Sequence, residues 1–337
     1  MGRWIVIALA AAALGAVARP GAAPSARARA VLTTVADVPL PGPAVRFDYQ
    51  SLDLRSDQLY IAHMGAGDVV VFDVKRRQVR GIIGDLPGVT GVWAVPALGR
   101  VYASVTGLHH VASIDERSQT VTDRIGTIGF PDGIAYAPDQ QKVYVSDEAG
   151  GGELVIDAKA NRVMHTIPID GEAGNSVFDP GSRCILVAVQ TKNQVWVIDP
   201  ASDRVLGRFD LAGAARPHGM ALDAARRIAF VANETDARVL IVDLKTMKVT
   251  GSVRVGADPD VLAFDPLWRR LYVASESGVI SVFTEIAGGL VPEGDVTMPH
   301  AHSLAVDPRT HLVYVPLQDI GGQPVLRIMA GTPPAGF

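Results

Sequence analysis

The sequence predicts an all-β protein, a seven-bladed β-propeller made of four-stranded blades. The first observation is that one bulky residue within a short β-branched segment recurs seven times, at intervals of 42 or 44 residues. A repeat of about 40–45 residues containing several short strands has the length of one propeller blade. The second observation is compositional, because 48% hydrophobic residues and 34 glycines suit a protein of strands and tight turns. We call the recurring residues the marker residues: Tyr60, Tyr102, Tyr144, Leu186, Phe230, Tyr272 and Tyr314.

The N-terminal segment is predicted to lie outside the propeller. Residues 1–18 have a short basic start and an apolar stretch from Trp4 to Val17, followed by a small-residue cleavage site at Ala16-Val17-Ala18. This pattern is typical of a secretory signal peptide. A second site, Ala28-Arg29-Ala30, extends the range of cleavage to residue 30. An uncleaved anchor is the alternative, but the apolar stretch is short for a membrane span. We therefore expect a periplasmic or secreted protein without a membrane span after cleavage.

Two sets of aspartates mark turns, each in five of the seven repeats. Asp-Pro sequences such as Asp265-Pro266 precede the marker residues by seven positions, and Asp can bond a backbone amide two residues on. We interpret these aspartates as turn caps and not as catalytic groups. The first set occupies the turn before the marker strand (Asp53, Asp179, Asp223, Asp265, Asp307), and the second lies thirteen residues after the marker (Asp73, Asp115, Asp157, Asp199, Asp243).

The last repeat predicts how the ring closes. It ends after the strand Val325–Met329, so it has no outer strand of its own, whereas Val31 to Pro41 before the first repeat forms an unassigned strand. We expect this N-terminal strand to complete the seventh blade, which removes the exposed edges of an open ring. Residues 31–330 then form one seven-bladed propeller, and residues 331–337 form a C-terminal tail.

The chain resembles the YVTN-repeat, or YncE-like, propellers of bacteria over residues 31–330. The similarity rests on strands such as LYVAS (271–275) and VYVSD (143–147), and on a following VxVID strand (195–199). The resemblance implies an exported binding protein. YVTN repeats also resemble the propellers of dehydrogenase subunits, which gives a further alternative, an accessory subunit of an exported redox enzyme.

The loops at one end of the propeller are predicted to be acidic. The connections between blades and between the second and third strands share one face, where we count three bases, Lys192, Arg216 and Arg238. Such a face attracts cations or basic partners and disfavours nucleic acid. A small polar or cationic ligand, or a protein partner, is therefore expected. The acids assigned to this face are Asp48, Asp68, Asp85, Asp132, Asp147, Glu148, Glu153, Asp170, Glu172, Asp210, Glu234, Asp236, Asp258, Asp260, Glu276 and Asp319.

Equivalent positions of a ring face one axis, which predicts a site at the channel mouth. Twelve residues before each marker, at the start of the innermost strand, the repeats carry Asp48, Thr90, Asp132, Gly174, His218, Asp260 and His302, with Asn175 beside them. The ends of the marker strands are expected to add a second tier: His63, Glu148, Asn233, Glu234 and Glu276. The ligand-binding set predicted from these positions is Asp48, Asp132, Asn175, His218, Asp260, Glu276 and His302.

Two functions fit these side chains. The first is a binding module that uses the acidic face and the central funnel, with ordered water or a small polar ligand in the mouth. The second is a lyase or lactonase with a divalent metal held by His218, Asp260 and His302, because two imidazoles and a carboxylate suit such an ion. Glu148, Glu234 or His63 are then the candidates for general acid–base catalysis. The Pro-x-Gly loops resemble those of streptogramin lyases and gluconolactonase-type propellers, but their ligand patterns do not transfer residue by residue.

Overall fold

The computed structural model describes residues 1–2 and 30–334. The chain divides into a unit of residues 1–30 and a unit that begins at Val31, and every strand found among the described residues belongs to the second unit. The expected signal peptide at 1–18 and its cleavage sites lie outside the described residues, apart from Met1, Gly2 and Ala30. Across the part that is described, no helix has the length and apolar character needed to cross a membrane.

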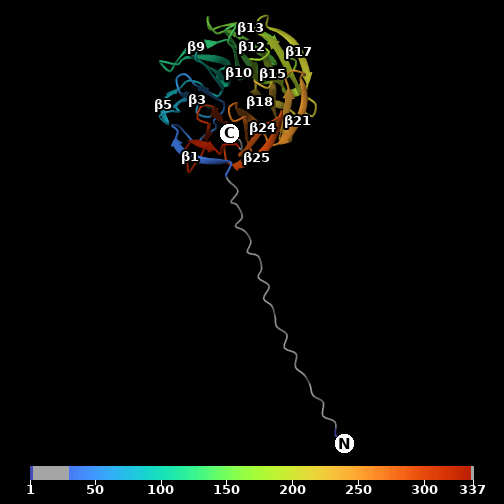
Figure 1. Cartoon of the computed structure of the whole chain (residues 1–337). Helices are drawn as coiled ribbons and strands as arrows, with labels where there is room; N and C mark the ends of the chain where they lie inside the picture. Colours follow the sequence, from blue (N-terminus) through green and yellow to red (C-terminus); the bar gives the residue numbers. More distant parts are fainter. Residues whose placement is uncertain (3–29, 335–337) are drawn as a thin grey trace. The chain divides into compact units, whose positions relative to one another are not determined.

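Seven antiparallel four-stranded sheets confirm the predicted propeller. In Figure 1 the blades follow one another around a ring, with outer strands such as β5, β9, β13 and β17 at its rim. Blades 1 to 4 comprise β2 (Gln50–Asp53), β3 (Gln58–His63), β4 (Asp68–Asp73), β5 (Gln78–Ile83); β6 (Val89–Val95), β7 (Arg100–Val105), β8 (His110–Asp115), β9 (Thr120–Ile125); β10 (Pro131–Ala137), β11 (Lys142–Asp147), β12 (Gly152–Asp157), β13 (Arg162–Pro168); and β14 (Ala173–Asp179), β15 (Cys184–Val189), β16 (Gln194–Asp199), β17 (Arg204–Asp210).

The remaining blades follow the same order. Blades 5 and 6 comprise β18 (Pro217–Asp223), β19 (Ile228–Asn233), β20 (Arg238–Asp243), β21 (Lys248–Arg254); and β22 (Pro259–Asp265), β23 (Arg270–Ser275), β24 (Val279–Ile286), β25 (Gly289–Thr297). Blade 7 comprises β26 (Ala305–Asp307), β27 (Leu312–Leu317), β28 (Val325–Gly331) and β1 (Leu32–Pro39). Short 3₁₀ helices follow the second strand in three blades: η1 (Thr106–Leu108), η2 (Gln190–Lys192) and η3 (Glu234–Asp236).

The N-terminal strand closes the ring, as predicted. β1 pairs antiparallel with β28, from Leu32 opposite Gly331 to Pro39 opposite Val325. Arg327 reinforces this pairing, because its Nε and Nη2 donate to the two carboxylate oxygens of Asp37 at 2.8 and 2.6 Å. The seventh blade therefore depends on both ends of the propeller sequence, and no blade is left with three strands.

The marker residues pack between blades, where all seven are buried. Two of their phenols also reach the neighbouring blade. Tyr102 Oη donates to the carbonyl of Ala158 at 3.0 Å and to Asn161 Oδ1 at 2.8 Å, and Tyr144 Oη donates to Asp203. A large side chain with a polar tip suits this position because its ring fills the interface while its hydroxyl finds a partner.

The turn aspartates act as caps in the structure. Asp53 Oδ1 accepts the backbone amide of Arg55 at 2.7 Å, and Asp243 Oδ1 accepts that of Lys245 at 2.7 Å. These bonds satisfy amides in the turns that would otherwise lack a partner, as the Asp-containing turn motif predicts.

Candidate functional site

The innermost strands place the residues of the channel mouth. In five of the blades the pairing of the innermost strand with its neighbour shifts close to its start, for example between Pro131 and Ile134 and between Pro217 and Met220. A β-bulge of this kind redirects a side chain and is common near functional sites. The residues at these shifts include Asp132 and His218, each the second residue of its strand at the channel mouth. Both are buried.

Glycines allow the innermost strands to come this close. A Cβ on Gly219 would lie 1.7 Å from the carbonyl oxygen of Asp260, and one on Gly91 would lie 2.1 Å from that of Asp132. Gly174 serves a different purpose, since a Cβ there would lie 3.0 Å from His218 Nδ1. Glycine is therefore required at positions 91 and 219 by the close approach of neighbouring blades.

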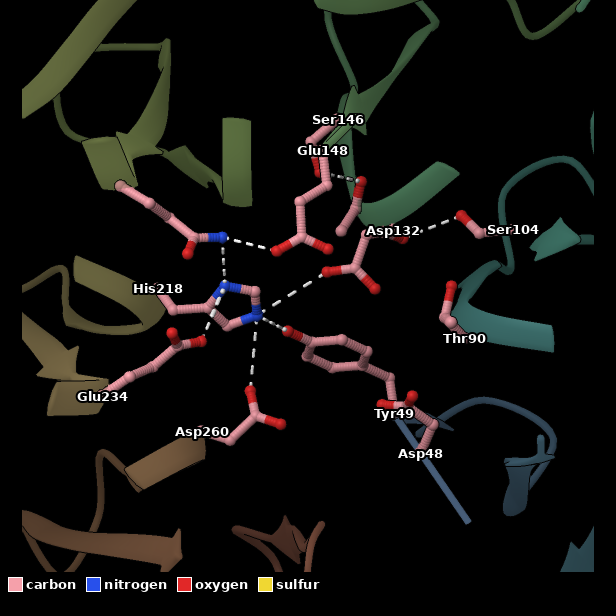
Figure 2. Close-up of polar contacts among 12 residues, drawn as sticks. Asp48, Tyr49, Thr90, Ser104, Asp132, Ser146, Glu148, His218, Glu234 and Asp260 are labelled. Atoms are coloured by element: carbon pink, nitrogen blue, oxygen red, sulfur yellow. Dashed lines mark hydrogen bonds and ion pairs between the residues drawn. The ribbon is translucent and has the colours of Figure 1, made fainter. Parts of the chain in front are cut away.

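His218 lies at the centre of a ring of carboxylates (Figure 2). Its Nε2 is 3.4 Å from Asp260 Oδ1, 3.6 Å from Asp132 Oδ2 and 3.1 Å from the hydroxyl of Tyr49. Its Nδ1 is 3.5 Å from Glu234 Oε1. Burial alone would lower the pKa of His218, but the carboxylates, Asp260 foremost, raise it to about 9. The imidazole is therefore a cation at neutral pH.

His302 occupies the equivalent position two blades further on. Its Nε2 lies 3.0 Å from Asp260 Oδ2 and 3.4 Å from Asp48 Oδ1, and its Nδ1 lies 3.3 Å from Glu276 Oε1. Burial again opposes protonation, but Asp260 and the other carboxylates raise the pKa of His302 to about 10. The hydrogen bond from His302 lowers the pKa of Glu276 to about 2. Asp260 thus links the two histidines through its two oxygens.

Carboxylates outnumber cations in the cavity that these residues surround. The cavity has a volume of about 160 Å³, and the charged groups around it, with His302 beside it, are Arg46, Asp48, Asp132, Glu148, His218, Glu234, Asp260 and Glu276. Six carboxylates therefore face three cationic side chains. Asp132 Oδ2 and Asp260 Oδ1 are buried, and neither has a hydrogen-bond partner among the described residues. Burial raises the pKa of Asp132 to about 8, against the opposing effect of His218.

The best metal-ligand geometry differs from the predicted one. Asp48, Asp260 and His302 offer ligand atoms within 4.8 Å of one another, whereas His218 is not part of this group. Two ligands that are each about 2.1 Å from one ion lie about 3.0 Å apart at right angles and about 3.4 Å apart at the tetrahedral angle. These are the separations from His302 Nε2 to Asp260 Oδ2 and Asp48 Oδ1. However, Arg46 Nη2 lies 2.9 Å from the same Nε2, so a guanidinium already supplies positive charge there.

The second tier is only partly placed as the sequence predicted. Glu148, Glu234 and Glu276, each four residues after a marker, line the mouth cavity, and in blade 1 the residue at that position is Met64. His63, one residue earlier, is fully buried against Phe47, with ring centroids 4.1 Å apart. Asn233 has the same phase and bonds the backbone amide of Ala215. Because successive side chains of a strand point to opposite faces, the shift of one residue turns both away from the funnel.

Other sequence predictions for this end need correction as well. Asn175 does not line the mouth cavity but a second chamber further along the channel. Glu153 was assigned to the acidic face, yet it is fully buried and bonds Ser176 in the next blade. The count of three bases omitted Arg46, which donates to Glu276 at 3.0 Å in the mouth.

Sequence analysis also missed two neutral groups. Gln190 Nε2 donates to Glu148 Oε1 at 2.6 Å and lies 2.9 Å from His218 Nδ1. Gln190 follows its marker by four residues, so the repeat phase could have identified it. Tyr49 follows Asp48 directly and lines both chambers. Burial holds the pKa of its phenol well above the usual value, so the hydroxyl stays protonated.

The comparisons with known proteins support the fold and no closer relationship. No protein-family model matches the chain, and no curated protein sequence does. Among solved structures 1750 chains match, which reflects how widely this architecture is used. Hydrazine synthase from Kuenenia stuttgartiensis is 16% identical, with a TM-score of 0.72 over 86% of this chain and 96% of that chain. A chain of a mitotic checkpoint complex is 13% identical, with a TM-score of 0.76 over 96% of this chain and 98% of that chain. The protein is a seven-bladed β-propeller, and these identities carry no activity across.

Proposed function

We propose that this protein is an exported, YncE-like binding module whose channel mouth holds a small cationic ligand. The observation that carries the proposal is a pair of buried carboxyl oxygens at the mouth cavity, Asp132 Oδ2 and Asp260 Oδ1. Neither accepts a hydrogen bond from the described residues, and their ion pairs with His218 Nε2 are long, at 3.6 and 3.4 Å. A buried polar atom without a hydrogen bond costs free energy. An ammonium group supplies the N–H donors that these oxygens lack and adds to the positive charge of His218.

The surrounding charges favour a cation over an anion. Even with both histidines protonated and Asp132 neutral, five carboxylates of the mouth face three cations, so an anion would add to the repulsion. The volume of about 160 Å³ admits the ammonium end of a short amine. A lysine side chain inserted by a protein partner would present the same group, so the cavity also suits a basic protein segment.

Calorimetric titration of the purified protein with putrescine, a short diamine, tests this proposal. We expect saturable binding that weakens as the salt concentration rises, because salt screens the attraction between the amine and the carboxylates of a solvent-accessible site. Burial raises the pKa of Asp132 to about 8, but a cation bound beside this carboxyl group favours its ionised form. Asp132→Asn keeps the size of the side chain and cannot ionise. This variant is expected to raise the Kd at least about tenfold, since charge-assisted hydrogen bonds contribute about 1.5–3 kcal/mol each.

Asp258→Asn is the matched control. Asp258 is an exposed aspartate of the loop before β22, and its backbone is left-handed with φ of 52°, a conformation that asparagine tolerates. The control should bind putrescine as the unmodified protein does. Equal loss in both variants would indicate a diffuse charge effect, and no binding by the unmodified protein would refute the cationic ligand.

The proposed export and family have a separate test. The support is the basic and apolar N-terminal sequence with its small-residue sites, together with the YVTN-like strands. Cell fractionation followed by N-terminal sequencing should find the protein outside the cytoplasm, with a new N-terminus after Ala18 or Ala30. A cytoplasmic protein that retains Met1 or Gly2 would contradict export.

The second candidate is the metal-dependent lyase or lactonase, and the favouring observation is the spacing of Asp48, Asp260 and His302. When bound, a divalent ion there would supply Lewis-acid chemistry. Glu276, whose Oε1 lies 3.3 Å from His302 Nδ1, would be the second-tier carboxylate in contact with this group. Metal analysis of protein incubated with Zn²⁺ or Mn²⁺ distinguishes this candidate. His302→Ala should lose the ion and His218→Ala should retain it, whereas an ion that is absent from the unmodified protein leaves the binding module as the better proposal.

A further inference from the structure

The channel contains a second chamber with the opposite chemistry to the mouth. Its volume is about 460 Å³, and its walls come from the innermost strands of all seven blades. None of the described residues around it carries a charge, in contrast to the eight charged groups at the mouth. Among the described residues, Tyr49 alone belongs to both walls. A charged ligand is excluded from such a space by its desolvation cost, whereas an apolar one gains from burial.

One side chain departs from the pattern of the repeat in this chamber. In each blade, one residue of the innermost strand lies directly opposite the marker residue of the second strand. This residue has a small or medium-sized side chain in six blades and is tryptophan in blade 2. The series is Ser51, Trp93, Ala135, Val177, Ala221, Ala263 and Ala305. Trp93 remains 37% exposed and lines the chamber. The exposed indole of Trp93 offers an aromatic surface for stacking, and the small side chains around it leave space for a ligand on that surface.

Two amides give the chamber its polar character. Gln50 Nε2 donates to Ser303 at 3.1 Å, which leaves its buried Oε1 without a partner among the described residues. Asn175 faces the backbone of Gly133, where a Cβ would lie 2.7 Å from its Oδ1. A few polar groups in a mainly apolar cavity of this size are typical of small-molecule sites. A donor on a ligand would give the acceptor of Gln50 a partner.

We propose that this chamber is a second binding site, specific for an uncharged aromatic molecule that carries one N–H or O–H donor. The ligand stacks on Trp93, fills the space left by the small residues, and donates to Gln50 Oε1. This site is independent of the cationic site at the mouth, because the two share only Tyr49.

Fluorescence titration with N-phenyl-1-naphthylamine tests the proposal, because this probe is uncharged, aromatic and carries one N–H. We expect saturable fluorescence enhancement with energy transfer from tryptophan, unchanged between about 0.05 and 0.5 M salt. Trp93→Ala should raise the Kd about tenfold or more, since an aromatic contact and its buried area are lost together. Trp93→Phe should recover most of the affinity.

Trp268→Phe is the matched control. Trp268 stacks on His311 with ring centroids 3.8 Å apart and is not among the residues of the chamber. This variant, and Asp132→Asn at the mouth, should leave the Kd for the probe unchanged. No saturable binding, or an equal Kd in Trp93→Ala, would overturn the second site, while loss in Asp132→Asn would overturn its independence from the first. Because Trp93 is more than one-third exposed, Trp93→Ala should fold, which circular dichroism checks.

Discussion

Replacing Glu153 by glutamine should change how the stability of the propeller depends on pH. Glu153 is the second residue of β12, the third strand of blade 3, at a position where four other blades carry buried valine: Val69, Val111, Val195 and Val239. Its Oε1 accepts a hydrogen bond from Ser176 at 2.9 Å, and its Oε2 has no partner among the described residues. Burial raises the pKa of Glu153 from 4.5 to about 8. The folded protein therefore binds a proton that the unfolded chain releases above pH 4.5.

The sign of the effect follows from this difference. An acid with a raised folded pKa gives its full stability below the unfolded value, and this stability is lost as the pH rises from 4.5 to about 8. Each pH unit in that range costs about 1.4 kcal/mol, so the loss reaches at most about 5 kcal/mol. Glutamine keeps an acceptor for Ser176 and never ionises. Glu153→Gln should match the unmodified protein near pH 4.5 and exceed its stability by a few kcal/mol at pH 8.

Urea unfolding followed by tryptophan fluorescence at pH 5, 6.5 and 8 provides the assay. Asp170→Asn is a suitable control, because the side chain of Asp170 is 83% exposed. Loss of this carboxylate should not alter how the free energy of unfolding changes with pH. If the stabilities of Glu153→Gln and the unmodified protein changed in parallel with pH, Glu153 would not be a buried neutral acid and the reasoning would be wrong.

Three further variants test the architecture. Gly219→Ala should lower the free energy of unfolding by more than about 3 kcal/mol, because its Cβ would overlap the carbonyl of Asp260; an unchanged melting temperature would contradict the close approach. Tyr144→Phe removes the hydrogen bond to Asp203 in the next blade and should cost about 1–2 kcal/mol in chemical unfolding, whereas no change would mean that the bond contributes nothing. Deleting residues 31–40 removes β1 and should expose an edge that promotes aggregation, measured by light scattering, while a monomer of unchanged stability would refute closure by this strand.

Sequence periodicity was sufficient to predict the blades and the mouth. The markers recur with a nearly constant interval, so the residue twelve positions earlier is brought to the same place in every blade. His218, Asp260 and His302 consequently meet as expected. The same logic predicted ring closure. The last repeat lacks an outer strand, and the sequence before the first repeat contains one unassigned strand, which pairs with β28 in the structure.

Periodicity could not resolve single-residue phase or the environment of one side chain. His63 and Glu148 are both near the end of a marker strand, but they differ by one position in the repeat and therefore face opposite ways. The burial of Glu153 and the choice of Asp48 over His218 as a metal-ligand candidate depend on distances between blades. Such distances are set by packing, which the repeat alone does not specify.

The most direct test of a cationic site is a histidine side-chain NMR titration of the purified protein, with and without saturating putrescine. Without the amine, we predict that His218 and His302 titrate with pKa values of about 9 and about 10. With the amine bound, both values should fall, because an additional cation beside Asp260 competes with the two imidazolium groups for the same carboxylates. Unchanged pKa values for both histidines at saturating putrescine would show that the amine does not occupy the channel mouth.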